Sequence, residues 1–247
     1  FIYLIGFYDD IYDLSPSKKS LLFLVTIYLL IISNPNMSIS ELRFYIFENK
    51  LTFNNFSIFL TMFCILAFMN SANMFDGINL QSAILYSSFL LVFFIKEIDQ
   101  RFLLIFLVSM IFFFYMNMQG KIFLGNNGSY FLSFLISIII ISDYNWNKNY
   151  FVEEIILYMF LPGIDMIRLV LLRIIKNKNP FEGDNNHIHH LLIKKFKYLK
   201  SIIIIFLFIF VPIILFNYLN IDLLILILLS FIFYSMILIL CVKKTIN

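Results

Sequence analysis

The sequence predicts an all-α, polytopic membrane protein, and three observations support that prediction. Apolar residues make up 62% of the 247 residues and charged residues only 13%, whereas a soluble domain is about half apolar and about a quarter charged. The apolar residues fall in long runs separated by short polar segments. Such a chain has too few polar groups to cover a water-exposed surface, so a water-soluble globule is excluded. A disulfide scaffold is excluded too, because two cysteines in a chain of this length define no framework.

Eight apolar runs follow one another as candidates for membrane-spanning helices. A helix needs about 20 mostly apolar residues to cross the hydrocarbon, and lipid cannot satisfy the open backbone groups of strands. The expected spans are Ser20–Ser33, Phe56–Met69, Leu80–Ile95, Phe102–Met118, Ser129–Ser142, Phe151–Ile175, Ser201–Asn217 and Leu223–Val242. An apolar stub, Phe1 to Leu4, is interpreted as the end of a span whose beginning is missing. Residues 1–247 are expected to form a single integral membrane domain.

Alternate loops are predicted to emerge on one face of the membrane. Two expected spans separate each of these segments from the next: Phe7–Lys19, Asn70–Asn79, Gln119–Gly128 and Lys176–Lys200. Counting the C-terminal tail, 13 of the 18 Lys and Arg residues fall on this face. The positive-inside rule makes this face cytoplasmic.

The same face holds the groups that carry chemistry. All three histidines, the pair Asp9–Asp10, Asp76 and five of the seven glycines lie there. A channel or a structural bundle gives no reason for this segregation. The sequence therefore predicts one cytoplasmic site built from four loops.

Asp9 and Asp10 lie where an apolar segment meets water, nine residues before a basic side chain at Lys19. Adjacent carboxylates at an interface are costly unless they bind cations or exchange protons. A solvated helix end explains the acidic pair equally well. Lys19 suits a phosphate or a counter-ion role.

Asn70, Asn73 and Asp76 follow one another at intervals of three residues, so one helical face presents all three. Gly77 then allows a turn or the close approach of a ligand to the backbone. Hydrogen bonds between spans would explain an asparagine, but they explain Asp76 poorly. The spacing therefore favours a functional site at the end of this apolar run.

Gly120–Ser129 is a glycine-rich turn that opens directly into an apolar run. Exposed amides at a helix N-terminus form a natural cradle for phosphate. Glycine-rich turns are also common as plain connections between spans.

His187, His189 and His190 fall within four positions. One interpretation is a metal site, although no Cys or second His cluster completes a zinc shell. The other is a pyrophosphate site, which the lysine-rich surroundings favour. The lysines that follow, at 194, 195, 197 and 200, are also interpreted as a patch for anionic lipid. Asp165 and Arg168, three residues apart, are expected to form an ion pair.

Taken together and in this order, these segments resemble the polyprenyl-phosphate N-acetylhexosamine-1-phosphate transferases of glycosyl transferase family 4. That family includes the bacterial enzyme that starts the lipid stage of peptidoglycan synthesis. The resemblance extends from about Gly6 to Leu192. The matching motifs are Gly-x-x-Asp-Asp at 6–10 with Leu-Ser-Pro-x-x-Lys at 14–19, Asn-x-x-Asn-x-x-Asp-Gly at 70–77, Phe-Leu-Gly-x-x-Gly-Ser at 123–129, the pair Asp165 and Arg173, and His-Ile-His-His at 187–190.

The resemblance implies a Mg²⁺-dependent transfer of a sugar 1-phosphate from a UDP-sugar to a polyprenyl phosphate, with release of UMP. Mn²⁺ is an expected substitute for Mg²⁺. Such a reaction initiates a lipid-linked cell-surface glycan in the bacterial inner membrane, with the active site on the cytoplasmic side. The His-x-His-His form resembles the branch that uses UDP-N-acetylhexosamines. No nucleic acid is expected as a partner, and a homodimer is compatible with the sequence.

The resemblance also assigns roles to residues. Asp9 or Asp10 would deprotonate or orient the lipid phosphate, and Asp76, a third catalytic residue, would lie at or beside the metal with Asn126. Substrate-binding residues would be Lys19, Asn70, Asn73, Asn79, Phe123, Gly125, Ser129, His187, His189 and His190. Among these, Phe123 and Asn79 would bracket the uracil, and the histidines would hold the diphosphate and sugar.

Two positions depart from the family pattern. Asn126 stands where a metal-binding Asp is usual, and an amide oxygen binds Mg²⁺ without a formal charge. Asn185 stands where a phosphate-binding Arg is usual. These changes favour an alternative, a catalytically degenerate relative that binds polyprenyl lipid or nucleotide without turnover. A transporter or channel ranks third, because the expected mid-span regions are almost free of charges.

Overall fold

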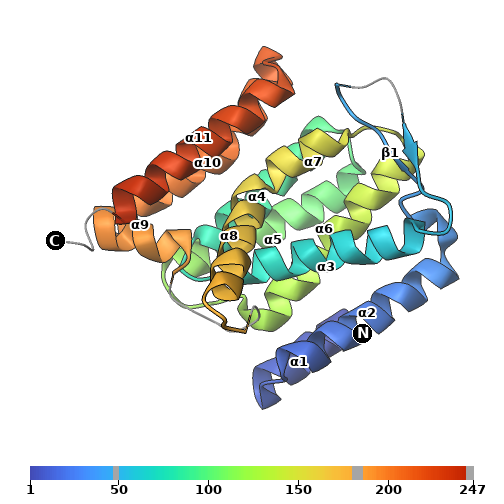
Figure 1. Cartoon of the computed structure of the whole chain (residues 1–247), viewed down its shortest axis with the longest axis horizontal. Coiled ribbons are helices and arrows are strands. Elements are labelled where there is room, and N and C mark those ends of the chain that lie inside the picture. Colours follow the sequence, from blue (N-terminus) through green and yellow to red (C-terminus); the bar gives the residue numbers. More distant parts are fainter. Residues whose placement is uncertain (47–49, 180–185, 243–247) are drawn as a thin grey trace. The chain divides into compact units, whose positions relative to one another are not determined.

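The computed structural model describes residues 1–46, 50–179 and 186–242 (Figure 1). Over these ranges the chain forms eleven α-helices, one 3₁₀ turn and a hairpin of two very short strands. The predicted all-α class is therefore confirmed. The chain divides into two compact units, residues 1–76 with 124–155 and residues 77–123 with 156–247. Each unit is described by itself.

The first unit is built around α6, which contacts α1 and α3. Its elements are α1 (Ile2–Tyr12), α2 (Pro16–Ser33), η1 (Pro35–Met37), β1 (Glu41–Leu42), β2 (Leu51–Thr52), α3 (Ser57–Phe75), α6 (Gly125–Trp146) and the start of α7 (Val152–Tyr158). Pro16 begins α2, where its fixed φ suits the first turn and its missing N–H costs nothing. Gly6 lets α1 approach α6 closely, because a β-carbon there would lie 2.7 Å from the α-carbon of Asn127.

A buried arginine ties the hairpin segment to α6 and α7. The backbone N–H of Arg43 donates to the Tyr144 hydroxyl at 2.6 Å, and its guanidinium lies 4.1 Å from the centre of the Tyr144 ring. The carbonyl of Arg43 accepts from the N–H of Val152 at 2.9 Å. These contacts fix the end of the unit that carries η1 and the hairpin. The sequence analysis finds no functional motif in this segment.

The second unit comprises α4 (Gln81–Ile95), α5 (Gln100–Met118), the end of α7, α8 (Phe160–Ile175), α9 (Ile188–Phe196), α10 (Tyr198–Leu219) and α11 (Leu223–Val242). Asp99 caps α5 by accepting from the N–H groups of Arg101 and Phe102, both at 3.0 Å. At the other end of α5, Asn117 accepts from the N–H of Leu80 at 2.6 Å. The start of α4 and the end of α5 are thereby held together.

Six helices of the described ranges are long and apolar enough to cross a membrane: α2, α3, α5, α6, α10 and α11. The structure differs from the prediction at the expected span Phe151–Ile175, which is two helices, α7 and α8, bent by 79° at Met159. Pro162 explains the break, because its ring clashes with the carbonyl four residues earlier and it has no N–H to donate. The expected span at Leu80–Ile95 is a helix of 15 residues, about 22 Å long and so shorter than the hydrocarbon of about 30 Å.

Two helices also extend beyond the apolar ranges expected from the sequence. The stub Phe1 to Leu4 supplies the N-cap and first residues of a helix, Ile2–Tyr12, that continues well past Leu4. The span expected from Ser129 begins at Gly125. In both places the polar motif belongs to a helical turn and not to a loop, so its backbone groups have fixed directions.

Candidate active site

In the first unit, Asp9 is buried and paired. It is 2% exposed, and its Oδ2 lies 2.8 Å from the Lys19 ammonium. Its Oδ1 accepts from the N–H of Leu14 at 3.1 Å. The Lys19 ammonium also lies 5.3 Å from the centre of the Tyr130 ring. Lys19 therefore serves as the counter-ion of Asp9, one of the two roles that the sequence suggested for it.

Asp10, the next residue, is exposed and faces the start of α6. Its two carboxylate oxygens accept from the backbone N–H groups of Asn126 and Asn127, each at 3.1 Å. A negative charge at this place is stabilised by the unpaired amides of the helix N-terminus. The amides that the sequence predicts as a phosphate cradle are thus bound to a carboxylate of the chain itself.

Glycine is needed at position 125, the first residue of α6. Its φ of +65° lies in the left-handed region, which side-chain-bearing residues adopt at a cost. A β-carbon there would be 3.4 Å from Asp10 Oδ2, an ordinary contact. The backbone conformation, and not lack of space, is what requires Gly125.

The face of α3 predicted from the spacing of Asn70, Asn73 and Asp76 lies at the end of that helix. Asn73 donates from Nδ2 to the Tyr130 hydroxyl at 3.1 Å. Asp76 is half-buried and caps the helix, with its N–H donating to the carbonyl of Asn73 at 3.2 Å. Asn70 is half-buried one turn earlier. Because Lys19 lies in the first turn of α2 and Asn73 in the last turn of α3, their common contact with Tyr130 shows that α2 and α3 return the chain to the same end of this unit.

The other predicted residues of the glycine-rich turn and its neighbours have different environments. Ser129 is fully buried in α6. In the second unit, Phe123 is 68% exposed. The backbone carbonyl of Asn79 accepts from the Tyr198 hydroxyl at 3.0 Å, which joins the start of α4 to the start of α10.

In the second unit, the three histidines form one cluster of rings at the start of α9. His187 is the N-cap residue of α9, and His189 and His190 lie in its first turn. The rings of His187 and His189 are nearly parallel, with their centres 5.3 Å apart. The ring centres of His189 and His190 are 4.3 Å apart. The sequence spacing alone produces this cluster once the helix begins at Ile188.

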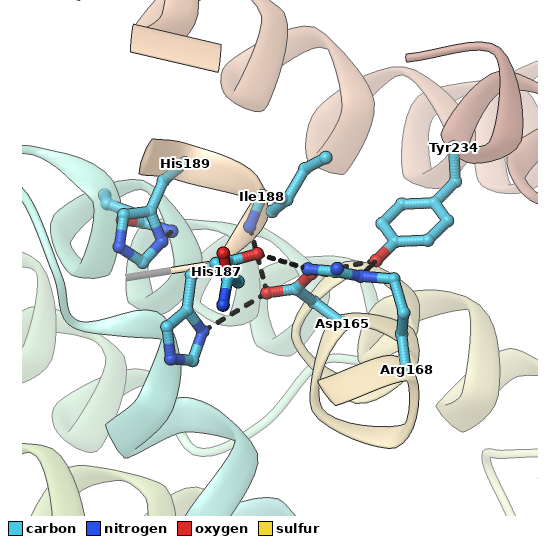
Figure 2. A network of polar contacts seen from close by, with 8 residues as sticks. Asp165, Arg168, His187, Ile188, His189 and Tyr234 are labelled. Carbon is cyan, nitrogen blue, oxygen red and sulfur yellow. Dashed lines mark hydrogen bonds and ion pairs between the residues drawn. The ribbon is translucent and has the colours of Figure 1, made fainter. Parts of the chain in front are cut away.

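Asp165 of α8 anchors the cluster, as Figure 2 shows. Its Oδ2 accepts from the N–H of Ile188 at 3.2 Å and lies 3.3 Å from Nδ1 of His187. Its Oδ1 accepts from Arg168 at 2.7 Å and from the Tyr234 hydroxyl at 2.8 Å. The predicted ion pair of Asp165 and Arg168 is confirmed, and the same carboxylate also joins α8 to α9 and α11.

His189 is buried against Gly77 and Gln81. Its Nδ1 lies 3.1 Å from Nε2 of Gln81, a side chain with no exposed surface. A β-carbon on Gly77 would collide with the His189 ring. The pKa of His189 is lowered to about 3, mainly by burial and further by the neighbouring His190 and His187 rings. This imidazole is therefore neutral at physiological pH.

Among the side chains of these arrangements, Gln81, Tyr130 and Tyr234 are absent from the sequence prediction. Gln81 is a polar residue at the start of an apolar run, and that position is a signal that could have identified it. The two tyrosines are hidden among 14 Tyr and 32 Phe residues. Asn185 lies outside the described residues.

Within the described ranges, no group of three or more His, Cys, Asp and Glu side chains is arranged to hold a metal ion. Mg²⁺ does not need such a group, because it takes one or two carboxylates and completes its shell with water and substrate phosphates. Asp76 and Asn126, both in the first unit, offer oxygen donors of the kind that Mg²⁺ prefers.

Comparison with known proteins identifies the family. Residues 1–143 match the sequence model described as Glycosyl transferase family 4. The chain belongs to glycosyl transferase family 4. It is 28% identical over 204 residues to the undecaprenyl-phosphate alpha-N-acetylglucosaminyl 1-phosphate transferase of Escherichia coli O157:H7, covering 77% of this chain and 55% of that protein.

Relatives from two other bacteria match at similar identity. The enzyme of the same name from Thermotoga maritima is 26% identical over 208 residues, which cover 83% of this chain and 62% of the relative. A probable undecaprenyl-phosphate N-acetylglucosaminyl 1-phosphate transferase of Bacillus subtilis is 26% identical over 215 residues, 83% of this chain and 59% of the relative. This family member thus spans less than two thirds of the length of these curated relatives.

Proposed function

We propose that this chain transfers an N-acetylhexosamine 1-phosphate from a UDP-sugar to a polyprenyl phosphate, releasing UMP, on the cytoplasmic face of the bacterial inner membrane. One observation carries the proposal. Asp10 and the start of α6 belong to two family motifs 116 residues apart, and the carboxylate and the helix amides are in direct contact. The names of the relatives support the class of acceptor and of transferred group.

The reaction exchanges one phosphoryl bond for another. An oxygen of the lipid phosphate forms a bond to the sugar-bearing phosphorus of the UDP-sugar. The bond from that phosphorus to the bridging oxygen breaks, and UMP leaves with the bridging oxygen. Two anions must approach each other, so catalysis depends on positioning and on neutralising negative charge.

Asp10 is the better of the two candidates to deprotonate or orient the lipid phosphate, because it is exposed whereas Asp9 is buried against Lys19. When Asp10 moves to the lipid phosphate, the N–H groups of Asn126 and Asn127 become available to an anionic oxygen. Asp9 and Lys19 then act as a fixed support for the last turn of α1.

Asp76 and Asn126 would hold Mg²⁺, with Mn²⁺ as a substitute. When bound, the ion neutralises charge that develops on the phosphoryl oxygens. Asn73 binds Tyr130 and orders the helix end that carries Asp76.

The donor nucleotide is assigned to residues of the second unit. The exposed ring of Phe123 offers a face on which uracil can stack, and the family motifs assign Asn79 to the same base. His187, His189 and His190 supply imidazole groups for the diphosphate and sugar.

The test is UMP release by the full-length protein in nanodiscs with undecaprenyl phosphate, Mg²⁺ and UDP-N-acetylglucosamine or another UDP-N-acetylhexosamine. Release that requires both lipid and metal supports the proposal. Binding of the nucleotide without UMP release would instead establish the degenerate relative, the alternative that Asn126 favours.

A further inference from the structure

We propose that Asp165 and Gln81 are positioning residues that hold two histidines of the cluster in opposite tautomers, with the Nδ1 of His187 protonated and the Nδ1 of His189 bare. The two imidazoles are almost parallel neighbours. They are the same side chain at the start of the same helix, but their hydrogen-bond partners differ. The assignment itself needs no substrate, whereas its consequence for a diphosphate rests on the proposed function.

The proton of His187 is placed by a carboxylate. Asp165 Oδ2 lies 3.3 Å from His187 Nδ1, and an ionised carboxylate can only accept. The negative form of Asp165 is favoured by the Arg168 guanidinium at 2.7 Å and by hydrogen bonds from Tyr234 and Ile188. His187 Nδ1 therefore carries a proton, and Nε2 is the bare nitrogen of the neutral ring.

The proton of His189 is placed by an amide. Gln81 Nε2 lies 3.1 Å from His189 Nδ1, and an amide nitrogen can only donate. His189 Nδ1 therefore accepts, and the proton of the neutral ring sits on Nε2. That Nε2 has no hydrogen-bond partner among the described residues, and the residue is 1% exposed.

The two tautomers give the histidines different chemistry. His189 is a hydrogen-bond donor that stays neutral over the physiological pH range. His187 Nδ1 donates to a carboxylate, and Nε2 of its neutral form is a hydrogen-bond acceptor. A buried donor without a partner is unfavourable; His189 Nε2 lies against Gly77, and a phosphate oxygen that reaches it beside this glycine would supply the partner.

Imidazole NMR tests the assignment directly. The full-length protein, labelled with ¹⁵N-histidine and held in nanodiscs without substrate, gives signals of His187, His189 and His190 that His187→Gln and His189→Gln assign. Protonated and bare ring nitrogens differ widely in chemical shift. We expect a protonated Nδ1 at His187 and a bare Nδ1 with a protonated Nε2 at His189. A bare Nδ1 at His187 or a protonated Nδ1 at His189 would overturn the proposal.

Substitutions at the two partners sharpen the test. Gln81→Glu replaces the donor by an acceptor and is expected to bring a proton onto His189 Nδ1, whereas Gln81→Met, of similar length, is not. Tyr234→Phe removes a donor from Oδ1 of Asp165 and leaves Oδ2 in place, so the His187 tautomer should not change. If Gln81→Glu and Gln81→Met give the same His189 spectrum, Gln81 does not set the tautomer. Should a variant fail to fold, the wild-type spectrum decides.

Activity separates this proposal from the proposed function. If the chain releases UMP, Gln81→Glu should raise the KM for the UDP-sugar about tenfold or more over Gln81→Met, because the donor to a charged oxygen is lost. If UMP is never released but the tautomers are as expected, only the proposed function fails. If Gln81→Glu alters the tautomer of His189 but leaves the KM unchanged, His189 does not take part in binding the UDP-sugar.

Discussion

Asp9 and Asp10 are neighbours in the chain with opposite environments, and the difference follows from helix geometry. Successive residues of a helix point about 100° apart. In α1 this turns Asp9 inward to Lys19 and leaves Asp10 at the surface, facing the amides of α6. We therefore expect a structural role for Asp9 and a chemical role for Asp10.

The two aspartates should respond differently to substitution. Asp9→Asn is expected to lower the free energy of unfolding by about 2–3 kcal/mol, because the Lys19 ammonium loses its charged partner. Asp10→Asn should change stability much less and should lower turnover at least a hundredfold. Thermal unfolding and UMP release, measured on both variants, check this. Equal stability losses would contradict the division of roles.

Asp76 and Asn126 form a matched pair for testing the metal. Asp76→Asn is expected to abolish turnover, because it removes the formal charge of the proposed metal ligand. Asn126→Asp adds a charge and should preserve or raise the rate while lowering the Mg²⁺ concentration needed for half-maximal activity. An unchanged rate for Asp76→Asn would remove this residue from the chemistry.

His189 makes stability depend on pH. The unfolded chain takes up a proton at this residue near pH 6.5, whereas the folded protein does so only near pH 3. Between these values the unfolded state binds more protons, so stability falls as the pH falls. From pH 7 to pH 5 the loss should be about 2 kcal/mol. Thermal unfolding of the wild type against His189→Gln isolates this contribution, and equal pH slopes would exclude it.

At the scale of elements, close helix contacts place the polar groups. The position of Asp10 against α6 depends on Gly6, which brings α1 close to Asn127. In the second unit, α9 begins where it does because Asp165 accepts the N–H of Ile188. Both cases show one helix end fixed by a residue of another helix.

Gly6 and Gly163 allow a controlled test of this packing. Gly6→Ala places a β-carbon 2.7 Å from the backbone of Asn127, so it should destabilise the protein by about 1–3 kcal/mol and lower turnover. A β-carbon on Gly163, in α8, would meet nothing within 4 Å, so Gly163→Ala should be neutral or stabilising. Thermal unfolding of both variants is the measurement. A neutral Gly6→Ala would show that α1 can shift without loss.

At the scale of the whole molecule, the distribution of charge along the chain predicts the topology. Single cysteines replacing Asp13 and Lys178, in a background with Cys64→Ala and Cys241→Ala, should react with a membrane-impermeant reagent only from the cytoplasmic side. A cysteine replacing Lys50 should react only from the opposite side. The prediction that four loops build one cytoplasmic site fails if Asp13 and Lys178 are labelled from different sides.

The sequence by itself determined the helical membrane class, the family and the polar clusters, because apolar runs and motif spacing are local properties of a chain. The helical break at Met159 shows the limit of such local patterns, because one long apolar run predicts one span where the structure has two helices. Only the tertiary structure decided that Asp9 is buried while Asp10 faces α6, and that Asp165 and Gln81 hold the histidines. These facts depend on contacts between residues 10, 22, 108 or 116 positions apart, and no local pattern encodes which side chains meet across packed helices.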